Sequence, residues 1–225
     1  MSLIRLLQLA SPALPVGAYA YSQGFEAAVL RGTIASEADA ATWLGDSLNM
    51  NIARWEAPLV SLLIGKWSMG NDEEISRMDR EFVASRETAE LREETLQMGY
   101  SLARLLIELP AFAAVAGYRG RLAGLQTPSY PTAWSAAAAA WSIAPHAAVE
   151  GYLFAWLENQ MMAAIKCVPL GQLAAQRMLA SLAATIPSLA REVLARDERA
   201  FGNFAPAYAI ASATHETQYS RLFRS

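Results

Sequence analysis

Few residues of this chain have the types and the spacing that catalysis or metal binding requires. Cys167 follows Lys166 at the end of an apolar stretch, whereas a reactive thiol needs an electropositive and partly exposed site. A free cysteine is more often a small core residue, and we expect a core position for Cys167. The pair His215-Glu216 lacks the second histidine of the H-E-x-x-H zinc motif. Because the whole chain has two histidines and one cysteine, we expect no tight zinc or nickel site.

The sequence also lacks the motifs of common nucleotide-binding and hydrolytic enzymes. It contains no G-x-x-x-x-G-K-[ST] phosphate-binding loop and no G-x-S-x-G nucleophile elbow. We therefore predict that the chain has no catalytic residues, is not an enzyme, and does not bind GTP through a phosphate-binding loop of its own.

Two polar features invite a functional interpretation, and each has a plainer alternative. The run from Arg86 to Glu94 is dense in mixed charges. It is either a polar docking face or a solvated helix face, and charge pattern alone favours the solvated face. Lys166 lies seven and fourteen residues after Asn159 and Tyr152, which places the three on one helix face. Lys166 is either a surface lysine whose stem covers apolar neighbours or a contact for an acidic partner, and the sequence leaves both open.

The last residues of the chain combine aromatic, apolar and cationic side chains. Tyr219, Leu222 and Phe223 stand beside Arg221 and Arg224, and such combinations anchor many protein–protein interfaces. A terminal segment is ordered only where something holds it. This tail either folds back onto its own domain or docks another protein, and we weigh the two alternatives evenly.

Helices must position these residues, because no stretch shows the sustained alternation of a strand. The strongest signal runs from Pro145 to Val168, where apolar residues recur at steps of three and four. Pro145 suits the first helical position, and Pro169 should end this helix and open another that reaches about Thr185. Further helices are expected over residues 36–55 with Ser36 as the cap, from Asn71 with Glu74 completing a capping box, over 87–107, and over the alanine run 136–140.

The expected architecture is a single all-α domain over residues 1–225, a helical bundle of about ten helices. Residues 1–24 contain prolines and glycines and are expected to form an irregular N-terminal segment. Residues 206–225 are expected to form a short helix and a partner-docking tail. Breaks between helices are expected near Gly70, Leu109-Pro110, residues 117–131 and Ile186-Pro187.

Composition limits the classes of partner. Apolar residues make up 54% of the chain and charged residues 17%, against about 25% charged in an average domain, which suits a helical body with apolar surface for protein partners. The net charge of −3 gives no basic excess for nucleic acid, and the single cysteine suits a reducing cytoplasm. Residues 122–149 carry no formal charge and are long enough to cross a bilayer. Prolines interrupt them, so we expect a loop and a buried helix, and no membrane association.

Four blocks of the sequence resemble the UreF family of urease accessory proteins. They are Leu9–Glu26 (LASPALPVGAYAYSQGFE), Arg86–Thr95 (RETAELREET), Ala164–Gln172 (AIKCVPLGQ) and Ala213–Ser225 (ATHETQYSRLFRS). They occur in the family's order and span nearly the whole chain. Small departures from the family pattern are Ala18, Ala20 and Phe25, where glycine, a small polar residue and leucine are common. None of them removes a charged or aromatic anchor.

The resemblance implies an all-helical, cytoplasmic homodimer that acts in urease maturation without catalysis of its own. It implies a complex with the accessory protein UreD, also called UreH, and with the GTPase UreG, and contact with the urease apoprotein through that complex. GTP hydrolysis would be coupled to nickel insertion. Nickel would pass through the complex, and this chain would bind no cofactor tightly.

The resemblance also transfers partner-binding roles to individual positions. The tail residues implied to meet UreD are His215, Glu216, Tyr219, Arg221, Leu222, Phe223 and Arg224. The residues implied to face UreG or to organise the dimer are Tyr19, Tyr21, Ser22, Gly24, Glu26, Arg86, Glu87, Thr88, Glu90, Arg92, Lys166, Pro169, Gly171 and Gln172. An alternative from another class stays open, namely an all-helical enzyme or small-molecule-binding protein with a pocket lined by some of the six tryptophans and eight tyrosines.

Overall fold

The computed structural model describes residues 2–225, which form helices and no strand, so the all-α prediction is confirmed. In chain order the elements are α1 (Ser2–Leu9), η1 (Ala18–Ala20), α2 (Phe25–Leu30), α3 (Glu37–Ser47), η2 (Leu48–Glu56), α4 (Ala57–Met69), α5 (Asp72–Ala84), α6 (Ala89–Glu108), α7 (Pro110–Ala113), α8 (Tyr118–Gly124), α9 (Tyr130–Ala140), α10 (Pro145–Cys167), α11 (Gln172–Ala183), α12 (Ile186–Ala195), η3 (Glu198–Ala200) and α13 (Pro206–His215).

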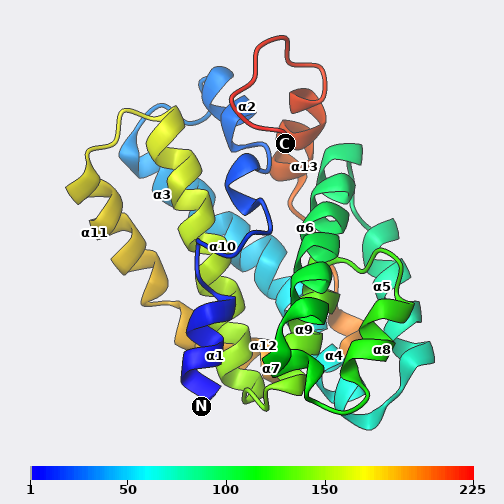
Figure 1. Cartoon of the computed structure of the whole chain (residues 1–225). Coiled ribbons are helices and arrows are strands. Elements are labelled where there is room, and N and C mark those ends of the chain that lie inside the picture. The colour runs from blue at the N-terminus through cyan, green and yellow to red at the C-terminus, as the bar shows by residue number, and fades with distance from the viewer. Residues whose placement is uncertain (1) are drawn as a thin grey trace.

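Helix α4 is central to the core and packs against α9, α10 and α12 (Figure 1). Its Leu59 and Leu63 are fully buried, as is Trp134 of α9. The alanine-rich α9 also contacts α6, and Ala136 and Ala137 have no exposed surface. The small alanine side chains allow neighbouring helices to approach closely, as the alanine run predicts.

Several helix starts follow the capping chemistry that the sequence predicts. The side chains of Ser36 and Asn71 accept hydrogen bonds from the amides of Asp39 and Glu74, each at 3.2 Å. Thr88 caps α6 in the same way. The helix that begins after Ser36 does not end at residue 55, because α3 continues through the π-helical η2 into α4. Helix α10 begins at Pro145 as predicted and ends at Cys167, one residue before the predicted end.

Helix α1 occupies residues for which the sequence predicts an irregular segment, so that prediction is wrong for residues 2–9. Tertiary packing supplies the reason. Leu9 is buried, and Leu6 lies so close to Gly151 of α10 that a Cβ at Gly151 would come within 2.5 Å of it. From Ala10 to Gly17 the chain follows an irregular path, in agreement with its prolines.

Two further boundaries differ from the predictions. Helix α8 lies inside the predicted break at 117–131, and it buries Leu122 against the body. Pro169 does not open a helix. It holds Val168 in an extended conformation, and α11 begins only at Gln172, after Gly171.

One helical stretch, Gln172–Ala195, passes a length and hydropathy test for a membrane span. It consists of α11 and α12, which are separated by a turn at Ala184 and Thr185. A single stretch of this kind is weak evidence, because core helices also pass such a test.

Candidate functional site

The N-terminal signature and the C-terminal tail lie against each other. In Figure 1 the red end of the chain runs beside the blue segment around α2. The amide of Ser22 donates to the carbonyl oxygen of Ser225 at 2.8 Å, and the amide of Arg224 donates to the carbonyl oxygen of Ala20 at 2.8 Å. Of the two alternatives for the tail, the structure therefore shows the first, in which the tail folds back onto its own domain.

The carboxylate of Glu26 is the centre of this contact. Its Oε1 accepts from Gln218 Nε2 at 3.0 Å and from the amide of Leu222 at 2.8 Å. Its Oε2 accepts from the amide of Phe223 at 3.0 Å and lies 3.3 Å from His215 Nε2. Glu26 is only 5% exposed, so nearly all of its hydrogen-bonding capacity serves the tail of its own chain.

A second set of contacts ties the tail to the start of α6. His215 is fully buried, and its Nδ1 lies 2.7 Å from Glu90. Arg221 forms an ion pair with the same carboxylate at 2.6 Å. Glu216 accepts from the amides of Ala89 and Glu90, where the partial positive charge of the helix N-terminus favours a carboxylate.

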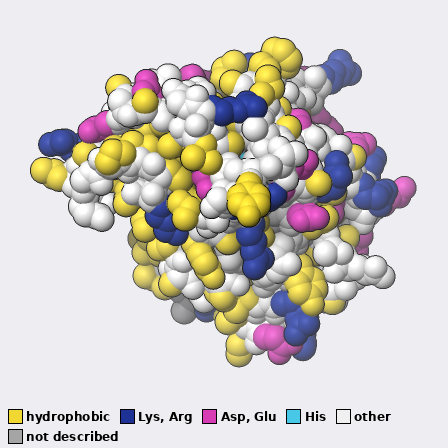
Figure 2. All heavy atoms as spheres, turned by 90° about the horizontal axis from the view of Figure 1, so that it is seen from above, with side chains coloured by type: hydrophobic (Ala, Val, Ile, Leu, Met, Phe, Trp, Pro, Cys, Tyr) yellow, Lys and Arg dark blue, Asp and Glu magenta, His cyan; other side chains and the backbone are white. Residues whose placement is uncertain are grey.

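The tail has an inward and an outward set of side chains. His215, Phe223 and Ser225 are buried, whereas Tyr219 is fully exposed and Leu222 is 71% exposed. The ammonium group of Lys166 lies 5.1 Å from the centroid of the Phe223 ring. Figure 2 views this end of the molecule from above and shows apolar and cationic side chains close to one another.

The charged run at the start of α6 is partly internal, so the prediction of a solvated face is wrong for three of its polar residues. Arg86, Thr88 and Glu94 are buried, while Glu87 and Arg92 are exposed. The reason is that the segment carries partners for polar groups on other elements. Thr88 Oγ1, for example, lies 2.8 Å from the hydroxyl of Ser212 on α13.

Arg86 forms a buried ion pair with Glu56. Its Nη1 donates to Glu56 Oε1 at 2.8 Å, and Tyr152 donates its hydroxyl to Glu56 Oε2 at 2.7 Å. The Nε of Arg86 is buried without a hydrogen-bond partner among the described residues. Tyr152 is therefore a buried hydrogen-bond donor to this ion pair and not a surface residue. It shares a helix face with Asn159 and Lys166, as predicted.

Gln23 joins the two ends of the chain to the core, although no feature of the sequence marks it as a site residue. Its Nε2 donates to Glu94 at 2.7 Å, and its Oε1 accepts from Trp156 at 2.8 Å and from Tyr208 at 3.1 Å. Ser225 Oγ donates to the other oxygen of Glu94 at 3.0 Å. Gln23 also has a positive φ of 52°, which is uncommon for a residue with a side chain.

Burial shifts the acid–base properties of this network. It raises the pKa of Glu94 to about 7, although hydrogen bonds from Gln23 and the charge of Arg86 oppose the shift. Burial also raises the pKa of Tyr208 well above its ordinary value. The thiol of Cys167 is half-buried, and burial raises its pKa to about 11, which keeps it protonated and unreactive near neutral pH.

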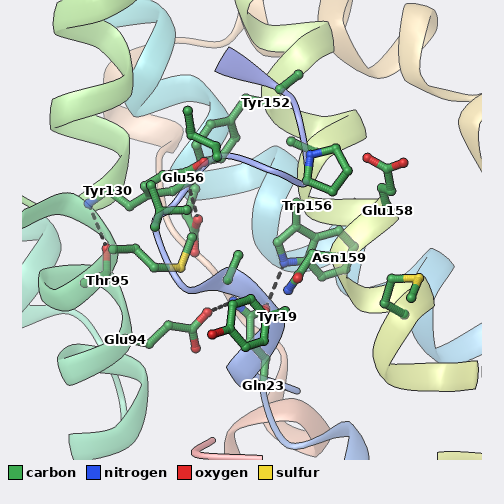
Figure 3. Close-up of a pocket in the computed structure, with 18 of the residues that line it drawn as sticks. Tyr19, Gln23, Glu56, Glu94, Thr95, Tyr130, Tyr152, Trp156, Glu158 and Asn159 are labelled. Carbon is green, nitrogen blue, oxygen red and sulfur yellow. Dashed lines mark hydrogen bonds between the residues drawn. The ribbon is translucent and has the colours of Figure 1, made fainter. Parts of the chain in front are cut away.

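A cavity of about 370 Å³ lies beside the network, between the N-terminal segment, α6 and α10 (Figure 3). Apolar groups dominate its wall, and Tyr130, Tyr152 and Trp156 contribute aromatic rings. The Glu56–Arg86 pair and Glu94 provide charged groups at its lining. This is the kind of aromatic pocket that the alternative function requires.

Of the remaining predicted site residues, two are buried and four are exposed. Gly24 and Tyr21 are buried beside the tail, and a Cβ at Gly24 would lie 2.7 Å from the amide nitrogen of Ser212. Tyr19 lines the cavity but is 70% exposed. Pro169, Gly171 and Gln172 are exposed in and after the connection between α10 and α11. Within residues 2–225 there is no group of three or more His, Cys, Asp or Glu side chains that could hold a metal ion.

The fold and the site define an all-α protein in which both chain ends build one polar network beside a cavity. The family model UreF matches residues 34–183 of the chain. The urease accessory protein UreF of Azoarcus sp. (strain BH72) is 59% identical over 225 residues, which are 100% of this chain and 96% of that protein. UreF of Dechloromonas aromatica (strain RCB) is 53% identical over 227 residues, which cover 100% of this chain and 98% of that protein. The bifunctional urease accessory protein UreEF of Bordetella bronchiseptica is 47% identical over 226 residues, covering 99% of this chain and 52% of that protein.

The chain therefore belongs to the UreF family of urease accessory proteins, as its four sequence blocks indicate.

Proposed function

We propose that this chain is a non-catalytic, cytoplasmic scaffold of urease maturation that binds UreD (UreH) through its tail and the GTPase UreG through a second surface. The observation that carries the proposal is the two-sided tail. Its inward side chains are anchored in the body, while Tyr219 and Leu222 project into solvent. A large aromatic and a large aliphatic side chain held outward on an ordered segment are typical anchors of an interface.

The second surface is proposed at the connection between α10 and α11. Lys166, Pro169, Gly171 and Gln172 are exposed there, and no side-chain hydrogen bond within the described chain occupies Gln172. By contrast, several residues carried over from the family resemblance are buried, so we propose that they act by shaping the surface from within. These are Tyr21, Ser22, Gly24, Glu26, Arg86, Thr88, His215 and Phe223.

Coupling to GTP hydrolysis follows from binding alone. A scaffold that binds one nucleotide state of UreG more tightly than the other shifts the equilibrium between them by that difference in affinity. Nickel is then cargo that passes through the assembly to the urease apoprotein, with a homodimer of this chain at its centre. The relative named UreEF supports action within an assembly, because it joins two accessory-protein names in one chain.

The test is co-purification with UreD and UreG, followed by size exclusion. Leu222→Ala should abolish co-elution with UreD because it removes an exposed anchor. Gln172→Ala should weaken co-elution with UreG. Met69→Ala is the matched control, since Met69 is 82% exposed at the far end of α4, and it should leave both complexes intact. Soluble wild-type protein that binds neither partner would contradict the proposal.

The cavity favours a second candidate function, the binding of a small apolar molecule. A volume of about 370 Å³ is at the small end of the range for ligand pockets, about 300–1,000 Å³. Bulky substitution of Ala155, which lines the cavity, would distinguish the two. Ala155→Leu should leave the scaffold's complexes intact but should abolish activity that depends on a ligand in the cavity.

A further inference from the structure

The outward face of the tail depends on a residue that does not belong to that face. We propose that Glu26 is a positioning residue for docking. Its buried carboxylate fixes the tail from Gln218 to Phe223 in the conformation that presents Tyr219 and Leu222, without meeting the partner itself. This inference rests on the proposed function of the tail as a docking segment.

Glu26 holds the backbone of the tail directly. Leu222 and Phe223 are consecutive, and their amides donate to the two different oxygens of the Glu26 carboxylate, at 2.8 and 3.0 Å. Two adjacent amides bound to one planar group restrict the direction of the chain. As a result the side chain of Phe223 points into the body and is 5% exposed, whereas the side chain of Leu222 points outward and is 71% exposed.

The turn around Tyr219 is fixed from the same point. Gln218 Nε2 donates to Glu26 at 3.0 Å and also to the carbonyl oxygen of Ser220 at 2.7 Å. Arg221 Nε donates back to the carbonyl oxygen of Gln218 at 2.9 Å. These bonds close the turn on its inner side, and Tyr219 is left fully exposed at its outer side.

Charge explains why a carboxylate is needed at this position. Among the described residues, no lysine or arginine lies within ion-pair distance of Glu26. The one basic side chain within that distance is His215, whose Nε2 lies 3.3 Å from the carboxylate. The amides and Gln218 therefore take the place of a cationic partner, and hydrogen bonds to an ionised acceptor are stronger than neutral ones. In Glu26→Gln one oxygen becomes an N–H group. That group would face a donor amide at Leu222 or Phe223, so the substitution removes at least one bond and weakens the others.

A tail that is already anchored loses its conformational entropy when the protein folds, and loses little more when a partner binds. Preorganisation of a binding segment raises its affinity because fewer degrees of freedom are lost on association. Glu26→Gln should thus lower affinity for UreD although residue 26 is buried beneath the tail.

The experiment combines a readout of the free protein with a readout of the complex. In the full-length chain, hydrogen–deuterium exchange is measured at the amides of Leu222 and Phe223, and UreD affinity is measured by titration. We expect Glu26→Gln to exchange about tenfold faster or more at these two amides, as for local opening, and to bind UreD about tenfold more weakly. Glu192→Gln, the same change at an exposed position on α12, should match the wild type in both.

Gln218→Ala serves as a second variant, because Gln218 is partly exposed and its loss leaves the core intact even if Glu26→Gln fails to fold. It should shift both readouts in the same direction by a smaller factor. Unchanged exchange at Leu222 and Phe223 in the folded variants would overturn the anchoring role, and faster exchange with unchanged UreD affinity would overturn the positioning role. Wild-type protein that does not bind UreD would contradict the proposed function instead, and the exchange data alone would then decide whether Glu26 anchors the tail.

Discussion

Arg86 and Glu56 form an ion pair of 2.8 Å in the interior, with side chains only 2% and 8% exposed. The two residues belong to different segments, since Glu56 ends η2 and Arg86 lies in the connection between α5 and α6. Their pairing, completed by Tyr152, joins the central helices to the part of the molecule that holds the tail.

Breaking this pair from one side should be costly. Arg86→Met leaves the Glu56 carboxylate buried without its cation, and we expect a loss of about 3–5 kcal/mol in the free energy of unfolding. Urea denaturation measures it. Arg77→Met is the matched control because Arg77 pairs with Glu74 and Glu81 at the surface, and it should cost less than about 1 kcal/mol. Equal losses in the two variants would show that burial does not distinguish the pairs.

Stability should depend on pH through Glu94. The folded pKa is about 7, above the ordinary 4.5, so the stabilising contribution of the protonated carboxyl is fully present below pH 4.5. It is lost as the pH rises to about 7 and then stays level. Glu94→Gln keeps the hydrogen-bonding shape but cannot ionise, and should lack this part of the pH dependence. The measurement is urea unfolding of both proteins at pH 5 and pH 8, and identical differences between the two pH values would refute the assignment.

Gly24 should tolerate substitution less well than Gly17. Both have a positive φ, 80° and 82°, so alanine at either position costs about 1–2 kcal/mol in backbone conformation. At Gly24 a Cβ would also lie 2.7 Å from the amide nitrogen of Ser212, whereas nothing lies within 4 Å at Gly17. Gly24→Ala should therefore lower Tm clearly more than Gly17→Ala in thermal unfolding followed by circular dichroism. Equal shifts would mean that α13 moves aside freely.

Truncation before Gln218 should destabilise the protein as well as remove its proposed docking segment. The deletion removes three donors to Glu26, namely the Gln218 side chain and the amides of Leu222 and Phe223, and it uncovers Glu94. We expect Tm to fall by about 5 °C or more. Loss of UreD binding on truncation would thus mix two effects, and the single exposed variant Leu222→Ala separates them if its Tm equals that of the wild type.

The sequence predicts the helices of this protein better than its site. Periodicity and proline positions locate α10, and side-chain caps locate the starts of α3 and α5, because these signals are local. Helix α1 escapes prediction because its place depends on Leu6 packing against Gly151, far along the chain. The start of α11 at Gln172, and not at Pro169, depends on the local path of the backbone, which a periodic pattern does not encode.

The site escapes prediction for a similar reason. The run from Arg86 to Glu94 has the composition of a solvated helix, and only the arrival of Glu56, Gln23 and Ser212 from distant segments makes its inner residues buried partners. Gln23 carries no signal of its own, since an uncharged amide is common at any surface. The family resemblance selects segments that meet in the structure, but only the exposed fractions separate residues that face outward, such as Tyr219, from those that support them, such as Glu26.

The bond from Ser22 to Ser225 spans 203 positions of the chain, which has a consequence for the order of events during synthesis. The ribosome makes Ser22 and Glu26 before it makes the tail, because a chain is synthesised from its N-terminal side at about 5–20 residues per second. Their hydrogen-bond partners in the tail emerge only after the rest of the helical body. The helical body can assemble while translation continues, but the proposed docking face forms only when residues up to Ser225 have emerged, so a chain that stops before them carries no complete surface for a partner.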